Sequence, residues 1–201
     1  DLDRLMGGLQ PSDLIILAAR PSMGKTALAM NIAVNAAKAF LSEQNKNQGS
    51  ESKKPKSVGI FSLEMSAQQL AVRVLSILTK IDSSRIRSGN INKEEFLTLS
   101  RESGNISAMP ILIDDTPALS ISALRTRARR MKRQHNLGVL IVDYLQLLHA
   151  SPGREKNRVQ EVGEITTGLK AIAKELDVPV IALSQLSRAV ESRDDKRPQL
   201  S

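Results

Sequence analysis

The chain has 201 residues, 41% of them hydrophobic, which is enough for one compact domain with a buried core. It has no cysteine, which excludes disulfides, thiolate zinc sites and cysteine nucleophiles and fits a cytoplasmic setting, and no apolar run is long enough to cross a bilayer. The net charge of +8 favours polyanionic partners, although an ordinary basic surface gives the same value, and only 2% of residues are aromatic. Any grip on nucleic acid is therefore expected to be electrostatic.

Short apolar runs rich in β-branched residues alternate with longer amphipathic runs, which is typical of βαβ units. The predicted strands cover residues 14–18, 58–63, 139–144 and 178–184, with 111–114 as a further candidate. The predicted helices cover residues 25–41, 67–79, 93–103, 121–135 and 158–176. Because the strands are continuously apolar, we expect an α/β fold with a mostly parallel sheet and helices on both faces.

Two polar segments interrupt this alternation. Residues 42–57 (SEQNKNQGSESKKPKS) cannot bury a core face and are predicted to be a mobile surface insertion in a single domain spanning 1–201. Residues 150–158 follow a strand and are predicted to be an exposed loop. The basic helix 121–135 spaces Leu124, Ala128 and Met131 along one face, which favours a packed face with solvated or intersubunit charges over a phosphate-binding helix.

The most specific motif is Ala19-Arg20-Pro21-Ser22-Met23-Gly24-Lys25-Thr26, which follows the first strand and opens the first helix. Such a P-loop turns backbone N–H groups toward phosphates, while its lysine reaches the β- and γ-phosphates and its hydroxyl ligates Mg²⁺. The usual first glycine is Ala19 here, so the loop must begin with ordinary backbone angles. The motif predicts binding of ATP with Mg²⁺.

Polar side chains lie at the ends of three predicted strands, at the sheet edge where α/β proteins bind ligands. Asp143 is the candidate for holding Mg²⁺ through water, with a turn cap as the alternative. Glu64 is the candidate general base that aligns water and accepts its proton, unless it only stabilises the N-terminus of the next helix. Gln185 can sense the γ-phosphate through its neutral amide, or is a simple surface glutamine.

Five segments together resemble one family, the bacterial replicative helicases of the DnaB family. They are residues 9–14 (LQPSDL), 18–26 (AARPSMGKT), 61–65 (FSLEM), 141–147 (IVDYLQL) and 182–188 (ALSQLSR). The resemblance spans nearly the whole chain and includes the alanine at the start of the P-loop. It implies a RecA-like P-loop NTPase core and a 5′–3′ motor that hydrolyses ATP as a homo-hexameric ring around single-stranded DNA. It also implies contacts with primase and a helicase loader through regions partly outside this chain.

The same resemblance implies roles for single residues, with Lys25, Glu64, Arg73 and Gln185 taking part in catalysis. Arg73 would reach the γ-phosphate within its own subunit, and Gln185 would couple that phosphate to the DNA-facing part. An arginine finger supplied in trans and the main DNA-contacting loop are expected beyond Ser201. The chain is therefore expected to be a motor domain that is incomplete at its C-terminus.

A DNA contact is also predicted for residues 151–158, where Arg154, Lys156 and Arg158 would touch phosphates, with a plain solvated loop as the alternative.

Two rival functions stay open. A RecA-like recombination or repair ATPase would use the same site on a filament. A regulator that binds ATP as a structural ligand would be indifferent to Glu64→Gln. A small-molecule kinase is disfavoured because no substrate lid can be recognised.

Overall fold

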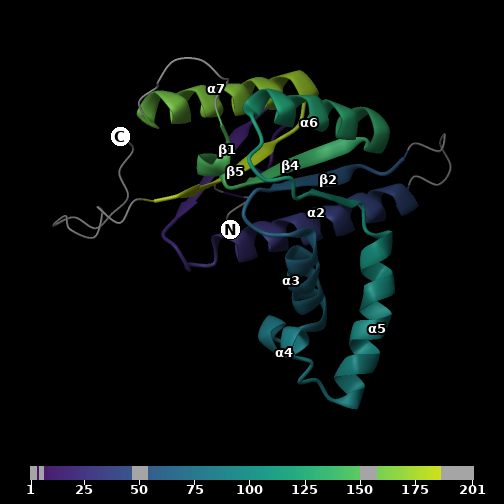
Figure 1. Cartoon of the computed structure of the whole chain (residues 1–201). Coiled ribbons are helices and arrows are strands. Elements are labelled where there is room, and N and C mark those ends of the chain that lie inside the picture. Colours follow the sequence, from purple (N-terminus) through teal and green to yellow (C-terminus); the bar gives the residue numbers. More distant parts are fainter. Residues whose placement is uncertain (1–3, 5–6, 47–53, 150–157, 187–201) are drawn as a thin grey trace.

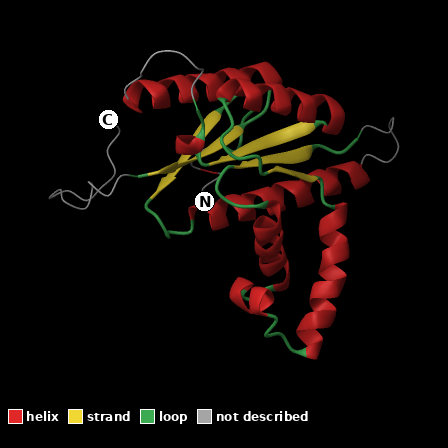
Figure 2. Ribbon diagram, in the orientation of Figure 1, coloured by secondary structure: helices red, strands yellow, loops and turns green. Residues whose placement is uncertain are grey.

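The computed structural model describes residues 4, 7–46, 54–149 and 158–186, and a parallel five-stranded sheet runs through them (Figures 1 and 2). The strands are β1 Leu14–Ala19, β2 Ser57–Ser62, β3 Ile111–Asp114, β4 Leu137–Asp143 and β5 Val180–Gln185. Their order is β1-β5-β4-β2-β3, and every neighbouring pair is parallel. The predicted parallel sheet is confirmed, with each strand end within two residues of its predicted place. β1 and β3 form the two edges.

Helices cover both faces of the sheet, as predicted. They are α2 Lys25–Lys46, α3 Ala67–Thr79, α4 Ser83–Ser88, α5 Lys93–Ala108, α6 Ile121–His135 and α7 Arg158–Leu176, with a 3-10 turn η1 at Leu145–Leu147. α6 and α7 lie on one face and α2 on the other, and α3, α4 and α5 extend away from the α2 side (Figure 1). None of the described helices is both long and apolar enough to span a membrane.

The continuously apolar strands contribute side chains to two separate hydrophobic cores, one on each face of the sheet. Ile60 faces the α2 side and its neighbour Phe61 faces the α6 and α7 side, because successive strand residues point to opposite faces. On one face Leu124 and Ala128 are fully buried, and Met131 packs against the same cluster, which confirms the predicted packed side of α6. The helix side chains buried on the other face include Ala29, Ala33, Ala37 and Leu70.

Helix ends differ from the predictions where the apolar pattern stops before the helix does. α2 continues to Lys46 rather than residue 41, because exposed polar residues such as Glu43 and Gln44 are good helix formers. Ser57 is buried at the start of β2, so both ends of the predicted 42–57 insertion are regular structure. Residues 47–53, at its centre, lie outside the described residues, and its predicted mobility stays a prediction.

Two further features of the α3 to α5 region were not predicted correctly. α5 passes through Gly104 and ends at Ala108, because one helical glycine costs only about 1 kcal/mol and does not end a helix. The six-residue α4 was missed because it is too short to show a periodic pattern. It is defined by its caps: Asp82 accepts from the Ser84 N–H, and Gly89 takes a left-handed φ of 73°.

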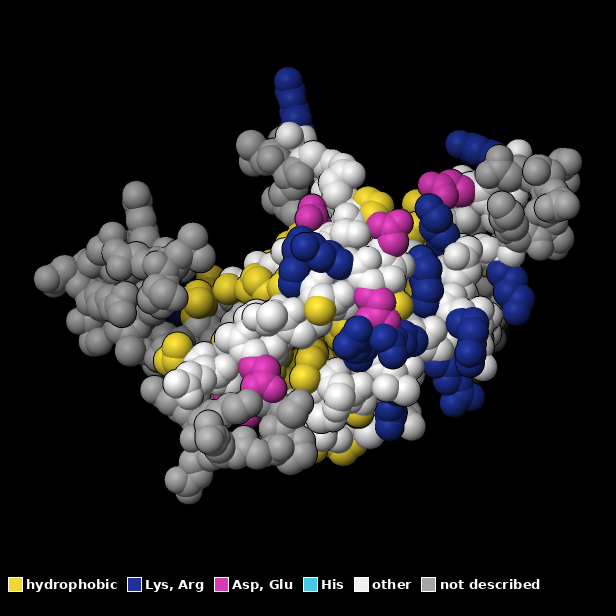
Figure 3. Space-filling view, turned by 90° about the horizontal axis from the view of Figure 1, so that it is seen from above, with side chains coloured by type: hydrophobic (Ala, Val, Ile, Leu, Met, Phe, Trp, Pro, Cys, Tyr) yellow, Lys and Arg dark blue, Asp and Glu magenta, His cyan; other side chains and the backbone are white. Residues whose placement is uncertain are grey.

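The charges of α6 are partly paired within the chain. Arg125 and Arg129 both form ion pairs with Glu175 of α7, and Arg127 lies 2.7 Å from the Asp114 carboxylate at the end of β3. Figure 3 looks down on this face and shows Lys and Arg side chains gathered on one side of it, with acidic side chains among them. These arginines therefore join α6 to neighbouring elements of the same chain. The sequence predicted solvated or intersubunit charges and did not predict these ion pairs.

Candidate active site

The P-loop connects the carboxyl end of β1 to the start of α2. Ala19 is an ordinary residue of strand β1, which explains how alanine replaces the usual glycine there. The special backbone angles occur later, at Ser22 (φ 63°) and Gly24 (φ 81°). The first helical bond joins the Leu28 N–H to the Gly24 carbonyl at 2.9 Å. The loop from Pro21 to Gly24 is exposed, so a ligand has access to the N-terminal end of α2, where backbone N–H groups lack helical partners.

Thr26 and Asp143 meet at the mouth of this loop. The Thr26 hydroxyl donates a 2.8 Å hydrogen bond to Oδ2 of Asp143, which is only 3% exposed. Burial raises the pKa of the Asp143 carboxyl above its ordinary value, and the Thr26 hydrogen bond and the positive charges of Lys25 and Arg73 oppose that rise. Two elements far apart in sequence are thus joined by one polar contact.

The second carboxylate oxygen of Asp143 makes this a candidate cation site. Within the described residues Oδ1 is buried and has no hydrogen-bond partner, which is costly unless water or a cation meets it. A hydroxyl and a carboxylate are the hard oxygen donors that Mg²⁺ prefers. No group of three or more His, Cys, Asp or Glu side chains gathers in the described part of the chain. The site therefore suits Mg²⁺ that completes its shell with water and phosphate oxygens, not a cage of protein ligands.

Tyr144 is a site residue that sequence reasoning missed. The Lys25 ammonium lies 4.7 Å from the centre of its ring, a cation–π contact between the P-loop and the residue after Asp143. The available signal was compositional, because this is the single tyrosine of a chain with very few aromatic residues and it directly follows a strand-end carboxylate.

Arg73 comes from the first helix after β2. It is half-buried on α3, and its positive charge acts on the Asp143 carboxylate. α3 is held at this edge by a capping box between Ser66 and Gln69 and by Asp115, whose carboxylate accepts from the Ala67 N–H at 2.8 Å. The residue that only the family resemblance indicated therefore lies within electrostatic range of the site.

Glu64 lies in the turn between β2 and α3 and is exposed. The Ser62 hydroxyl closes this turn by donating to the Met65 carbonyl at 2.7 Å, and the Leu63 N–H donates to the Asp143 carbonyl at 2.7 Å. Glu64 lies two residues before Ser66, the N-cap of α3, and outside the first turn of that helix, so its role as general base stays a prediction beside the alternative of a solvated acid at the helix start. The turn that carries Glu64 is hydrogen-bonded to the strand that carries Asp143.

Gln185 ends β5 and is exposed, and its backbone is in register with Ala19 at the start of the P-loop. The sheet thus places Gln185 beside the nucleotide loop, on the strand between β1 and β4.

The three residues predicted to contact DNA cannot be placed in the same way. Arg154 and Lys156 lie outside the described residues, and Arg158 begins α7 with a side chain that is also outside them.

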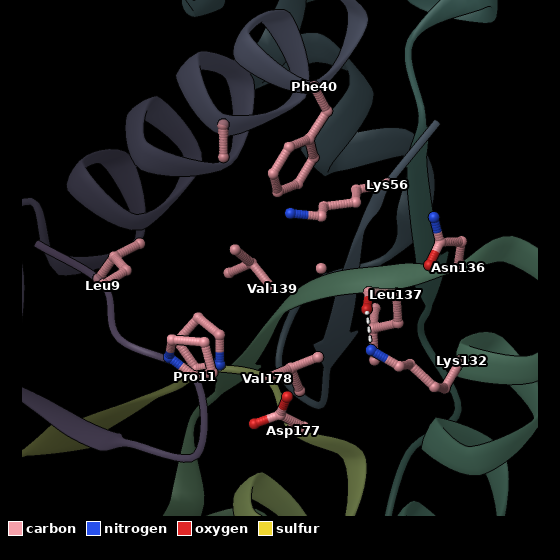
Figure 4. Close-up of a pocket in the computed structure, with 13 residues that line it drawn as sticks. Leu9, Pro11, Phe40, Lys56, Lys132, Asn136, Leu137, Val139, Asp177 and Val178 are labelled. Carbon is pink, nitrogen blue, oxygen red and sulfur yellow. Dashed lines mark hydrogen bonds between the residues drawn. The ribbon is translucent and has the colours of Figure 1, made fainter. Parts of the chain in front are cut away.

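A separate hollow of about 250 Å³ lies at the opposite edge of the sheet, near the amino ends of β4 and β5 (Figure 4). Its two lysines already have partners. The Lys56 ammonium lies 5.9 Å from the centre of the Phe40 ring, and the Lys132 ammonium donates to the Leu137 carbonyl at 3.1 Å. This hollow shares no residue with the P-loop edge.

The DnaB-like helicase C terminal domain family matches this chain over residues 1–201. The chain belongs to that family. Among named relatives it is 57% identical to the replicative DNA helicase DnaB of Rickettsia typhi and 49% identical to that of Geobacillus stearothermophilus. Both alignments cover all of this chain but only 39% and 41% of the relatives. This DnaB-like domain therefore spans about two fifths of the length of its curated relatives.

Solved structures agree with this DnaB-like assignment. A DnaB-like replicative helicase, studied with its primase interactions, has a TM-score of 0.81 and 34% identity, covering 100% of this chain and 45% of that one. A second solved structure, of an ATPase domain, has a TM-score of 0.84 and 35% identity, covering 99% of this chain and 66% of that one. The RecA-like fold is confirmed, and the helicase family is favoured over the recombination ATPase that the sequence left open.

Proposed function

We propose that this chain is the ATP-hydrolysing motor of a replicative DNA helicase that moves 5′–3′ on single-stranded DNA. The observation that carries the proposal is the Thr26–Asp143 hydrogen bond, which joins the P-loop to the end of β4 beside the Lys25 and Arg73 charges. The family match supports it, because relatives that include this whole domain are named replicative DNA helicases.

The first part of the mechanism is phosphate binding. The N-terminal end of α2 and the Lys25 ammonium favour the negative β- and γ-phosphates. Mg²⁺ would be held by the Thr26 hydroxyl and, through water, by Asp143. When bound, it would neutralise part of the negative charge of the phosphates. Asp143 is suited to this because it already accepts from Thr26 and keeps Oδ1 for a water or cation.

The second part is attack by water on the γ-phosphorus. Glu64 orients the water and accepts one of its protons as the new P–O bond forms. The bond from the γ-phosphorus to the β,γ-bridging oxygen breaks, and ADP leaves with that electron pair. Arg73 and Lys25 stabilise the negative charge that spreads over the transferring group. The products are ADP and inorganic phosphate.

The third part is coupling to DNA and to partner subunits. Gln185 would hydrogen-bond the γ-phosphate and respond when it is lost, because it lies beside the P-loop at the end of β5. The excess of basic residues supports contact with DNA phosphates. We extend the proposal to a homo-hexamer whose neighbouring subunits complete the site, and to contacts with primase and a loader. Primase interaction is named for a structural relative.

The decisive experiment measures ATP hydrolysis by the full-length helicase with and without single-stranded DNA. Lys25→Ala should weaken nucleotide binding, while Glu64→Gln should keep binding but lose turnover about 100-fold or more, because it removes only the base. Lys38→Ala, an exposed residue of α2, is the control and should change neither quantity.

Two outcomes would contradict the proposal. Turnover that DNA does not stimulate in the wild type would favour a regulator that only binds ATP. Undiminished turnover in Glu64→Gln would leave the motor in place but remove Glu64 as the base.

A further inference from the structure

Among the described residues, the end of β5 has a strand partner on only one side. Its pairing with β4 ends at Val142 and Ala182, whereas its pairing with β1 continues to Ala19 and Gln185. Beyond that point the Leu186 N–H still donates to the Ala19 carbonyl at 3.1 Å. Alternate peptide groups of a strand point to opposite sides, so the peptide groups of Gln185 face the side that β4 has left.

The side chain of Gln146 takes the place of the missing strand. Its Nε2 donates to the Gln185 carbonyl at 3.0 Å and to the Ser184 hydroxyl at 2.9 Å. Its Oε1 accepts from the Gln185 N–H at 3.2 Å. A carboxamide carries the same donor and acceptor as a peptide group, so one side chain satisfies both backbone groups of Gln185.

Gln146 lies three residues after Asp143, in η1. The Asp143 end of this short segment is tied to Thr26 through its side chain and to Leu63 through its carbonyl. The Gln146 end is tied to Gln185. One segment of four residues therefore contacts the P-loop helix, the Glu64 turn and the end of β5.

We propose that Gln146 is a positioning residue that fixes the Gln185 backbone to the Asp143 segment, so that changes at Asp143 during ATP turnover displace Gln185. This rests on the proposed function, in which Gln185 senses the γ-phosphate. Leu145 and Leu148 are buried and anchor the η1 segment independently of the Gln146 contacts with Gln185. Gln146 itself is only half-buried.

The test uses the full-length helicase with Gln146→Met, which keeps the size of the side chain and removes both hydrogen-bonding groups. Its Kd for ATP is expected to stay within about twofold of the wild type, while the stimulation of turnover by single-stranded DNA falls about tenfold, a typical size for lost coupling. Gln44→Met is the matched control, because Gln44 is an exposed glutamine of α2, and it should retain full stimulation.

Gln146→Glu provides a readout that loss of packing alone would not give. Its ionised carboxylate can accept from the Gln185 N–H but cannot donate to the Gln185 carbonyl, whereas the protonated carboxyl can do both. DNA stimulation relative to the wild type should therefore recover as the pH is lowered from about 8 to about 5.5, since burial beside a carbonyl raises the pKa of a carboxyl. Gln146→Met should show no such recovery.

The outcomes separate the two proposals. Full stimulation in Gln146→Met and Gln146→Glu, with a stimulated wild type, overturns the positioning role and leaves the motor intact. Loss in both variants without recovery of Gln146→Glu at low pH also overturns it, because that pattern marks a general structural defect. A wild type that DNA does not stimulate overturns the motor proposal and this inference together.

Discussion

At the residue scale, the buried carboxylate of Asp143 lowers the stability of the fold, although the proposed function requires it. Its raised pKa means that the folded state binds this proton more tightly than the unfolded state does. The free energy of unfolding therefore falls as the pH rises from the ordinary carboxyl pKa of 3.8 through the raised pKa of the folded state. Lowering the pH back through the same range restores it. In the proposed function, this charge is what attracts Mg²⁺.

Asp143→Asn should consequently stabilise the protein and inactivate it. Without nucleotide or Mg²⁺ at pH 7.5, we expect the melting temperature to rise by about 2–4 °C, because the amide is buried at lower cost than the carboxylate. ATP turnover should fall about 100-fold or more. Thermal melts from pH 7.5 to pH 4.5 provide the check, since the advantage of the variant must shrink as the wild-type carboxyl takes up its proton. An advantage that is constant with pH would contradict this explanation.

Tyr144 gives a second prediction at this scale. Tyr144→Phe keeps the ring beside the Lys25 ammonium, so the KM for ATP should stay within about twofold of the wild type. Tyr144→Leu removes the ring and should raise that KM by about 3- to 30-fold, which corresponds to the usual strength of a cation–π contact. Steady-state kinetics of both variants measures the difference. Equal values for both would show that the ring does not position Lys25.

At the element scale, the packing of α6 on α7 depends on one glycine. Gly168 of α7 is so close to Ile121 that an added Cβ would lie 2.5 Å from its Cγ1 atom. The ion pairs of Glu175 with Arg125 and Arg129 join the same two helices. Those pairs are partly exposed and screened by solvent, so the close contact is expected to matter more for stability than the charges do.

Gly168→Ala should therefore destabilise the domain by about 1–3 kcal/mol, because the Ile121 side chain or one of the two helices must shift. Gly163→Ala is the matched control on the same helix, where an added Cβ meets nothing within 4 Å. That change should be neutral or stabilise by up to about 1 kcal/mol through helix propensity. Urea unfolding of both variants compares them directly. Equal stability of the two would mean that α6 and α7 adjust freely.

Elements were predictable where one physical pattern dominates. The buried strands and amphipathic helices followed from apolar runs, and the P-loop followed from a motif whose flanking strand and helix are local in sequence. α4 was not predictable, because its caps and not its periodicity define it. The contacts of Tyr144 and Gln146 also stayed hidden, because their partners Lys25 and Gln185 lie far away in the sequence and meet them only through strand order.

At the scale of the whole molecule, the chemistry gathers at one edge of the sheet because all five strands are parallel. The P-loop and the Glu64 turn follow the carboxyl ends of β1 and β2, and Asp143 and Gln185 are the last residues of β4 and β5. Their proximity therefore comes from topology and not from sequence distance. The hollow around Phe40 lies at the opposite edge.

β1 forms an outer edge of the sheet in the described residues, and its Ile16 side chain is 44% exposed. An open edge offers a row of backbone donors and acceptors to any extended segment, including the same edge of another copy. When residues 1–201 are produced by themselves, we expect self-association that grows with concentration and that Ile16→Lys suppresses, as measured by light scattering. Within the described residues, the strand that supports the P-loop thus also presents an open edge to amyloid-like misassembly.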